Sequence, residues 1–204
     1  MKRVLTVVIA LFFTTSLYGV SSDSMQESIS KNIQKGLDML SSDQEAVLED
    51  PAKLFDLVDP FFNYTLMARL SLGNAWNSLD NSQKREFVTK YEQKLKEGLL
   101  MALEFYSDET VNVKEPKKQG TRIHMPMEIE SGGETYSVLF KFHEAKEDDW
   151  LIYDLDIVGV SVVQSFRNIF ASYDGKSFDN LINLLDQDPG LEDAQKQLDK
   201  VTQD

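Results

Sequence analysis

The sequence contains no cysteine among its 204 residues and only two histidines, His124 and His143. Without cysteine there can be no disulfide, no thiolate metal site, no cysteine nucleophile and no lipid anchor on a cysteine. Basic residues are also scarce, since 21 Lys and Arg stand against 34 Asp and Glu, which gives a formal net charge of -13. A surface with this charge repels phosphate backbones and anionic bilayers, so the composition argues against nucleic acid as a partner.

Long apolar runs are missing too, apart from one near the start of the chain. Residues 4–13 (VLTVVIALFF) follow Lys2 and Arg3, and the polar residues 14–16 come after them. As a helix, such a stretch rises about 15 Å, which is half of a bilayer core and too short for a membrane anchor. A basic start, a short apolar stretch and a following segment of small, polar residues are typical of a cleaved export signal.

We therefore expect residues 1–19 to be a signal peptide, with cleavage after Gly19 or, as the second choice, after Ser22. Residues 20–204 are then a single soluble domain outside the cytoplasm, in the periplasm of a cell with two membranes. This length is enough for one sizeable core. Losing the two basic residues of the signal takes the formal charge from -13 to -15.

The mature chain begins with helical periodicity. Apolar residues that recur every three or four positions predict a first helix. A Ser-Ser-Asp segment at 41–43 either ends this helix or caps the next one. A second helical stretch covers residues 51–72, and Pro60 should break it because proline lacks the N–H and clashes with the preceding turn. A capping-box pattern, Asp80 with Gln83, predicts the start of a long helix over about residues 82–106.

Beyond the long helix the period changes to two. Residues 123–129 and 136–142 alternate apolar with polar side chains on either side of a Ser-Gly-Gly turn, which predicts an antiparallel hairpin with one apolar face. A further strand is expected at 150–157, and residues 111–114 could add a fourth. Because Pro126 has no N–H to donate, its strand should lie at an edge or carry a bulge.

Helical periodicity returns after the sheet. It predicts a helix over residues 162–173 and two short acidic helices at 178–185 and 191–201. The predicted class is therefore α+β, a small twisted antiparallel sheet of about four strands covered by helices.

Groups that carry chemistry are few. His124 and His143 lie on the polar side of neighbouring predicted strands and could bind a metal with Glu128, but solvated strand histidines are far commoner than zinc sites. The chain has no Gly-rich phosphate loop, no nucleophile elbow and no helical histidine motif. We expect a protein that is not an enzyme, with no catalytic residue, no metal and no cofactor.

Large apolar side chains are abundant instead, with twelve Phe and seven Met. One face of the predicted sheet and the helices expected to cover it are both apolar. Such side chains fill an ordinary core, but they could equally line a pliable cavity for an aliphatic guest. Periodicity does not separate these two structures.

Several motifs stand in a recognisable order along residues 60–170. The first group comprises PFFNY at 60–64, MARLSLG at 67–73, Trp76, Gln83, Phe87 and Leu95, and the second comprises Trp150, Tyr153-Asp154, Gly159-Val160-Ser161, Arg167 and Phe170. With these motifs in this order the chain resembles the MlaC family, also called the toluene-tolerance family. It departs from the family pattern at Asn63, where an acid is usual, and at Val158, where Glu is usual.

The resemblance implies a fold, a function and partners. The fold would be an NTF2-like sheet plus a helical part that together enclose a hydrophobic lipid pocket. The function would be that of a periplasmic carrier that shuttles phospholipid between the outer membrane and an inner-membrane ABC transporter and so maintains outer-membrane lipid asymmetry. The implied partners of this monomer are a phospholipid, the transporter complex with its MCE-domain protein, and an outer-membrane lipoprotein–porin complex.

Residues of the inward faces of sheet and helices would then hold the acyl chains. The residues predicted for lipid binding are Phe61, Phe62, Met67, Leu70, Trp76, Leu95, Leu99, Met125, Met127, Val138, Phe140, Phe142, Val160, Val163 and Phe166. Gly159 is expected to turn the backbone toward a helix that Ser161 caps.

Two other functions stay open. Cone-shaped α+β folds also host hydratases and isomerases, which need a polar group deep in the cavity. Tyr64, Tyr136 and Asp154 are the candidates for that group. The other alternative is a carrier for a different hydrophobic cargo, such as a lipoprotein or a small molecule.

Overall fold

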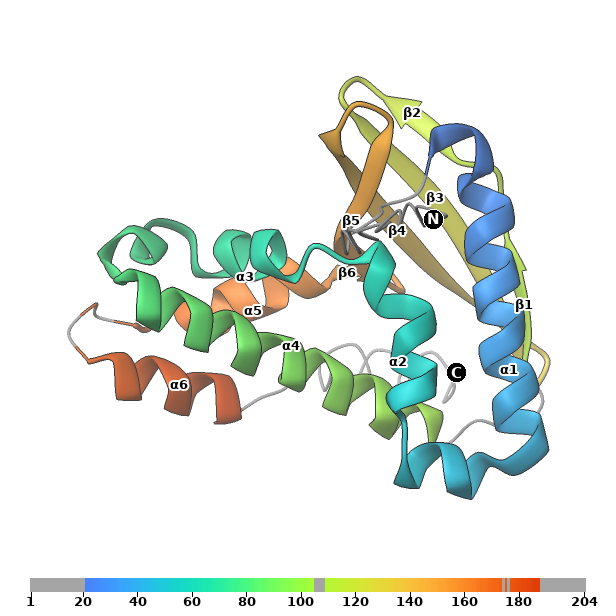
Figure 1. Ribbon diagram of the computed structural model, residues 1–204, viewed down its shortest axis with the longest axis horizontal. Coiled ribbons are helices and arrows are strands. Elements are labelled where there is room, and N and C mark those ends of the chain that lie inside the picture. Colours follow the sequence, from blue (N-terminus) through green and yellow to red (C-terminus); the bar gives the residue numbers. More distant parts are fainter. Residues whose placement is uncertain (1–20, 105–108, 174, 176, 188–204) are drawn as a thin grey trace, which may run out of the picture.

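The chain forms an antiparallel sheet with two helices along one side of it, and a group of further helices extends away from it (Figure 1). The computed structural model describes residues 21–104, 109–173, 175 and 177–187. The predicted signal peptide and the helix predicted at 191–201 lie outside the described residues. Within the part of the chain that is described, no helix has the length and apolar character needed to cross a membrane.

The element order is helices, then the sheet, then helices again. The α-helices are α1 (Met25–Glu49), α2 (Ala52–Val58), α3 (Tyr64–Leu72), α4 (Asn81–Leu103), α5 (Val162–Phe170) and α6 (Phe178–Gln187). The 3-10 helices are η1 (Ser22–Ser24), η2 (Asp59–Phe61) and η3 (Gly73–Ser78). The strands are β1 (Thr110–Val113), β2 (Lys117–Gln119), β3 (Arg122–Ser131), β4 (Glu134–Lys146), β5 (Asp149–Ile157) and β6 (Val160–Ser161).

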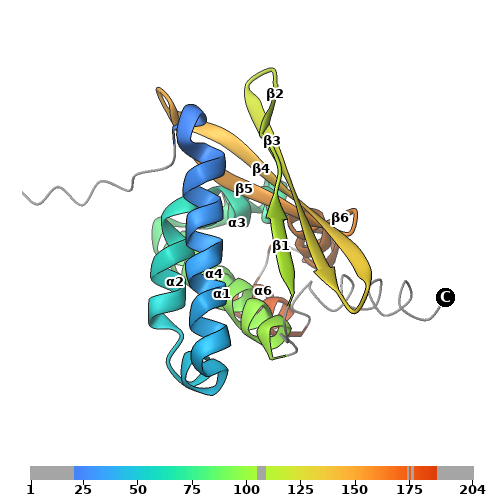
Figure 2. The same cartoon turned by 90° about the vertical axis from the view of Figure 1, so that its right-hand side faces the viewer.

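The predicted α+β class is confirmed, with a correction to the number of strands. The sheet has six strands in the order β1-β3-β4-β5-β6, and β2 pairs with β3 beside β1. The sequence predicts about four strands because β2 and β6 have three and two residues, too few to show a period of two. In Figure 2, α1 and α2 stand on one side of the sheet.

Side-chain caps mark the starts of α4 and α5, as the sequence predicts. The Asp80 carboxylate accepts from the N–H groups of Ser82 and Gln83 while Gln83 reaches back to Asp80, which completes the capping box of α4. Ser161 Oγ caps α5 by accepting from Gln164 N–H at 3.1 Å. The Ser-Ser-Asp segment does lie at a break, because Asp43 has φ -163° and ψ 83° and its carboxylate accepts from Ala46 N–H.

Pro126 lies inside the sheet, so the predicted edge position is wrong, but the partners of β3 do shift register at this point, between β1 and β2. Its strand, β3, pairs with β4 on one side and with both β1 and β2 on the other. The Pro126 carbonyl accepts from Lys114 N–H, just beyond the end of β1. Because the N–H and C=O of a strand residue point the same way, the side of Pro126 that lacks an N–H also faces Lys114, where the regular pairing with β1 has ended.

A bulge in β5 changes which of its side chains face the helices. The register of β4 against β5 shifts at Tyr153, an extra residue on β5. As a result Ile152 and Leu155, three positions apart, share the face of the sheet that carries Phe142 and Phe140. This face is the one that packs against the helices.

The apolar interior is divided into two large clusters. One joins the start of α1 to the sheet and contains Met25, Ile29, Ile123, Met125, Met127, Val138, Phe140, Phe142, Trp150 and Ile152. The other joins α3, α4, α5 and α6 and contains Met67, Ala68, Leu72, Leu79, Phe87, Tyr91, Val162, Phe166, Phe170, Leu181 and Leu185. Phe62 and Leu155 are the residues that pack against both.

A buried ion pair fixes the end of the sheet to the start of α5. Asp154 is 5% exposed and accepts from Lys141 Nζ at 2.8 Å, from Ser161 Oγ at 2.8 Å and from Val163 N–H at 3.1 Å. Lys141 is held by Asp156 as well, at 2.6 Å. One carboxylate therefore links β4, β5 and the N-terminus of α5.

Replacement of Asp154 by Asn should lower the free energy of unfolding by about 2–4 kcal/mol, because a buried charge pair is broken while its other partner stays buried. Denaturant unfolding measures this loss. Glu128→Gln is the matched control, since the Glu128–Lys114 pair on the same sheet is about 40% exposed and should cost about 0–1 kcal/mol. Equal losses in the two variants would contradict the assigned role of Asp154.

Val158 holds a backbone conformation that a β-branched residue rarely adopts. Val158 has φ 50° and Gly159 has φ 83°, and they join Ile157 to its partner Val160 as a two-residue hairpin turn. Positive φ at both positions is the type I′ pattern, which favours Asn-Gly. The strain at Val158 therefore costs stability.

Val158→Asn should raise the free energy of unfolding by about 1 kcal/mol, because Asn tolerates positive φ and Val does not. Gly159→Ala should lower it by a similar amount, since the added methyl meets nothing within 4 Å and the cost comes from the backbone alone. Thermal and denaturant unfolding of the two variants check these signs. A lower free energy of unfolding for Val158→Asn than for the wild type would show that Val158 is not strained in this turn.

Candidate functional site

A cavity of about 380 Å³ lies between the two apolar clusters. Helices α1, α2, η2, α3 and α4, strands β3 to β5 and the start of α5 contribute to its wall. The lining residues are Ile29, Asn32, Ile33, Phe55, Leu57, Val58, Phe61, Phe62, Tyr64, Met67, Leu95, Lys96, Gly98, Leu99, Ala102, Met127, Ile129, Val138, Phe140, Ile152, Leu155, Ile157 and Val162. This volume falls in the range of small-molecule sites.

The lining is almost entirely apolar. Asn32, Tyr64 and Lys96 are the lining side chains that carry polar groups. The Asn32 amide donates to the Leu57 carbonyl at 2.9 Å. This hydrogen bond ties α1 to α2 and satisfies the amide N–H of Asn32. Such a wall offers hydrocarbon a better environment than water.

Several residues predicted for lipid binding lie in this wall. They are Phe61, Phe62, Met67, Leu95, Leu99, Met127, Val138 and Phe140. They come from η2 and the segment after it, from α3 and α4, and from the two long strands. The structure thus brings sheet and helix residues together around one space.

Other residues predicted for lipid binding do not line the cavity. Met125 and Phe142 are fully buried in the sheet cluster, and Phe166 is fully buried in the helical cluster. Trp76 and Val163 pack against the helical cluster from its edge, while Leu70 and Val160 are half-buried elsewhere. Their part in lipid binding stays a prediction.

The contribution of α1 and α2 to the cavity wall was not predicted from the sequence. Ile29 and Ile33 line the cavity from α1, and Phe55 and Val58 line it from α2. The helical spacing of these residues predicts an inward face, but nothing in that spacing tells which space the face borders. Gly98 was also missed; as the small residue of the α4 wall it leaves room in the cavity.

A polar cluster lies where the cavity wall reaches solvent. We call it the rim cluster, and it consists of Asp59, Tyr64, Glu92 and Lys96. Lys96 Nζ is 2.6 Å from both Asp59 Oδ2 and Glu92 Oε1, and Tyr64 Oη donates to Asp59 Oδ1 at 2.8 Å. The cluster connects η2 and α3 to the middle of α4.

The rim cluster fixes the protonation of its members. Burial of Tyr64 and its hydrogen bond to Asp59 raise the pKa of the phenol, so it stays protonated at neutral pH. Burial alone would lower the pKa of Lys96, but the hydrogen bonds to Asp59 and Glu92 outweigh it and raise the pKa above its ordinary value. Lys96 is therefore a permanent cation at the wall of the cavity.

The C-terminal half of α4 covers the cavity while remaining partly open to solvent. Leu99 lines the cavity and is 37% exposed, and Met101 is 53% exposed. The end of α4 is tied to α1 by Gln44, whose amide donates to the Leu103 carbonyl at 2.7 Å. An apolar wall with exposed apolar side chains is typical of a surface that meets an apolar ligand or partner.

The comparisons with known proteins agree with this geometry. A family model described as MlaC protein matches residues 26–187. The chain belongs to the MlaC family. No curated protein matches the chain.

Among solved structures, this MlaC-family chain is similar to the phospholipid-binding protein from Ralstonia solanacearum, solved in complex with a phospholipid. The TM-score is 0.68 at 19% sequence identity, and the match covers 82% of this chain and 97% of that chain. The likeness shows that the two chains share a fold.

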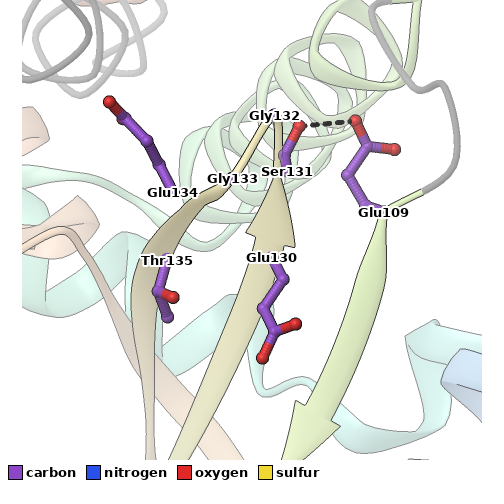
Figure 3. Close-up of a pocket in the computed structure, with 7 residues that line it drawn as sticks. All are labelled: Glu109, Glu130, Ser131, Gly132, Gly133, Glu134 and Thr135. Carbon is purple, nitrogen blue, oxygen red and sulfur yellow. Dashed lines mark hydrogen bonds between the residues drawn. The ribbon is translucent and has the colours of Figure 1, made fainter.

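A second hollow, of about 320 Å³, lies at the tip of the β3–β4 hairpin (Figure 3). Its charged members are Glu109, Glu130 and Glu134, and Ser131 Oγ donates to Glu109 at 3.0 Å. In Figure 3 the Glu130 and Glu134 side chains point away from each other, so the carboxylates do not converge on a point. Within the described ranges, no three His, Asp or Glu residues form a group that could hold a metal.

His143 lies on the outer side of the sheet beside Asn63. Asn63 Oδ1 accepts from Leu66 N–H as the cap of α3, so its Nδ2 faces His143 Nε2, at 2.9 Å. An amide donor requires an unprotonated Nε2, which assigns the neutral tautomer with hydrogen on Nδ1. Burial and the nearby Arg69 and Arg122 lower the pKa of His143, although a backbone hydrogen bond at Glu144 opposes them.

The low pKa of His143 predicts a pH dependence of stability. Because the unfolded histidine binds a proton near pH 6.5 and the folded one resists it, stability should be complete above pH 6.5 and fall as the pH drops through the lowered folded value. His143→Gln should remove this part of the slope, so Tm of the variant should fall less than that of the wild type between pH 7 and pH 5. Parallel Tm curves for the wild type and the variant would contradict the assignment.

Proposed function

We propose that this MlaC-family protein carries phospholipid, with the acyl chains in the cavity and the headgroup at the rim cluster. The observation that carries the proposal is the apolar cavity of about 380 Å³ between the two clusters. An empty apolar space of this size costs stability, so its presence indicates a hydrophobic ligand. The fold shared with a phospholipid-binding protein supports the same ligand.

Energetics then dictate how such a carrier works. Each buried methylene contributes about 0.8 kcal/mol relative to water, so a bound lipid does not leave for the aqueous phase. Exchange must take place in contact with a partner that offers another apolar environment. Any direction of transport comes from the energy source of that partner, because a binding protein alone shifts no equilibrium between two membranes.

On this basis we infer a periplasmic shuttle between two membranes. Its partners would be an inner-membrane ABC transporter complex with an MCE-domain protein and an outer-membrane lipoprotein–porin complex, and the result would be outer-membrane lipid asymmetry. The export signal predicted at residues 1–19 fits this location. Cleavage of this signal would leave residues 20–204 as the mature carrier.

Binding fits the site better than catalysis. Of the polar groups considered for an enzyme, Asp154 is held in the Lys141 ion pair, and Tyr136 lies on the β3–β4 hairpin with its hydroxyl on Glu134. Tyr64 does line the cavity, but its raised pKa keeps it protonated and its proton is committed to Asp59. A phenol in this state is a poor general base.

Solvent extraction of the freshly purified protein, followed by mass spectrometry, tests the carrier proposal. About one phospholipid or more per protein is the expected result. A different hydrophobic molecule at that ratio would support the other cargo, and an empty protein that turns over a small substrate would support an enzyme. Either result would overturn the phospholipid proposal.

Leu99→Asp should lower phospholipid retention by about tenfold, because it places a carboxylate in the apolar wall. Leu99 is already partly exposed, so the fold should tolerate the change. Met101→Asp is the matched control, since Met101 lies on the same helix, is 53% exposed and does not line the cavity. The measurement is the lipid-to-protein ratio after incubation with phospholipid vesicles. Equal retention in both variants would show that the α4 wall does not contact the lipid.

A further inference from the structure

The rim cluster carries a net negative charge, and the headgroup of a bound phospholipid would lie beside it. We propose that Asp59 and Glu92 receive the ammonium group of a zwitterionic headgroup, so that the protein selects ammonium-bearing phospholipids over anionic ones. This inference rests on the proposed function and names its preferred substrate class.

The position of the rim cluster makes it the place for a headgroup. Tyr64 and Lys96 line the cavity, and Lys96 is the charged member of that lining among the residues described. The side chains of Asp59 and Glu92 are each 34% exposed, against 20% for Lys96. The cluster therefore runs from the apolar wall to water, as the polar end of a lipid does.

The charges of the cluster do not cancel. One ammonium, on Lys96, lies between two carboxylates at 2.6 Å each, which leaves a formal charge of -1. A carboxylate has about four acceptor sites on its two oxygens, so both acids can accept from a second cation while they hold Lys96. The whole chain adds to this field, with its formal net charge of -13.

Aromatic rings help to hold Lys96 in the rim cluster. Lys96 Nζ lies 4.9 Å from the ring centre of Phe55 and 5.5 Å from that of Tyr64. Both rings line the cavity as well, so they hold the Lys96 ammonium beside the space where the lipid would bind.

A zwitterionic headgroup complements this arrangement in both of its charges. Its phosphate can approach Lys96 while its ammonium approaches Asp59 or Glu92. An anionic headgroup brings a phosphate without a compensating cation and raises the negative charge at the rim. Because the carboxylates are partly exposed, the bias should be modest, about fivefold, which corresponds to about 1 kcal/mol.

The test offers the purified protein vesicles of equal parts phosphatidylethanolamine and phosphatidylglycerol with identical acyl chains. After re-isolation of the protein, mass spectrometry gives the ratio of the two bound lipids. We expect about five to one in favour of phosphatidylethanolamine for the wild type and about one to one for the double variant Asp59→Asn with Glu92→Gln. The control is Glu86→Gln with Glu97→Gln, which changes the net charge equally on exposed positions of α4 outside the lining and should keep the wild-type ratio.

The outcomes separate this inference from the carrier proposal. Bound lipid with no headgroup bias in the wild type, or a bias that survives in the double variant, would overturn the headgroup inference and leave the carrier intact. Protein that takes up neither lipid would overturn the carrier proposal itself. If the double variant fails to fold, the wild type alone tests the inference through its salt dependence. The ratio of bound phosphatidylethanolamine to phosphatidylglycerol should fall between about 0.05 M and about 0.5 M salt, because screening weakens the charge interactions. A bias that is unchanged by salt would overturn the inference.

Discussion

The fold depends on one constraint, which is that its two apolar clusters meet without merging. Phe62 and Leu155 contact both clusters, and the cavity occupies the rest of the boundary between them. In a protein interior packed to ordinary density, side chains from the two sides would interdigitate and leave no such space. Here sheet and helices stand apart, and a few fixed points hold them in that relation.

Those fixed points are backbone and ionic contacts that do not fill the cavity. Phe62 bridges to Ile152 as a parallel partner, and Asn63 N–H donates to the Ile152 carbonyl at 2.8 Å. The bulge at Tyr153 then turns Leu155 toward the cavity, and Asp154 ties β4 and β5 to α5. Across the opening, the rim cluster links η2 to α4. The separation of the layers is thus held at its edges by polar groups, while the middle stays apolar.

Much of the architecture follows from the sequence, because its signals are local. The helical stripes, the break at Pro60, the Asp80 capping box and the β3–β4 hairpin each depend on residues close together in the chain. The strands β2 and β6 escaped prediction because they are too short to show a period. The place of Pro126 escaped it because the gap between β1 and β2 is a property of the assembled sheet.

The cavity wall was harder to predict, because period tells which face of a strand is inward but not what lies opposite. Met125 and Met127 share one face of β3, yet Met125 is fully buried in the sheet cluster whereas Met127 borders the cavity. Phe142 and Phe140 divide in the same way on β4. What separates them is where along each strand the cavity ends, which no pattern within the strand records.

An experimental structure of the protein purified with its native ligand is the most direct test of the central claim. The account predicts continuous density for at least one hydrocarbon chain between the β3–β4 wall and α4, bordered by Ile129, Phe140 and Leu99. Density for ordered water throughout this space, or side chains repacked so that the two clusters form one solid core, would contradict it.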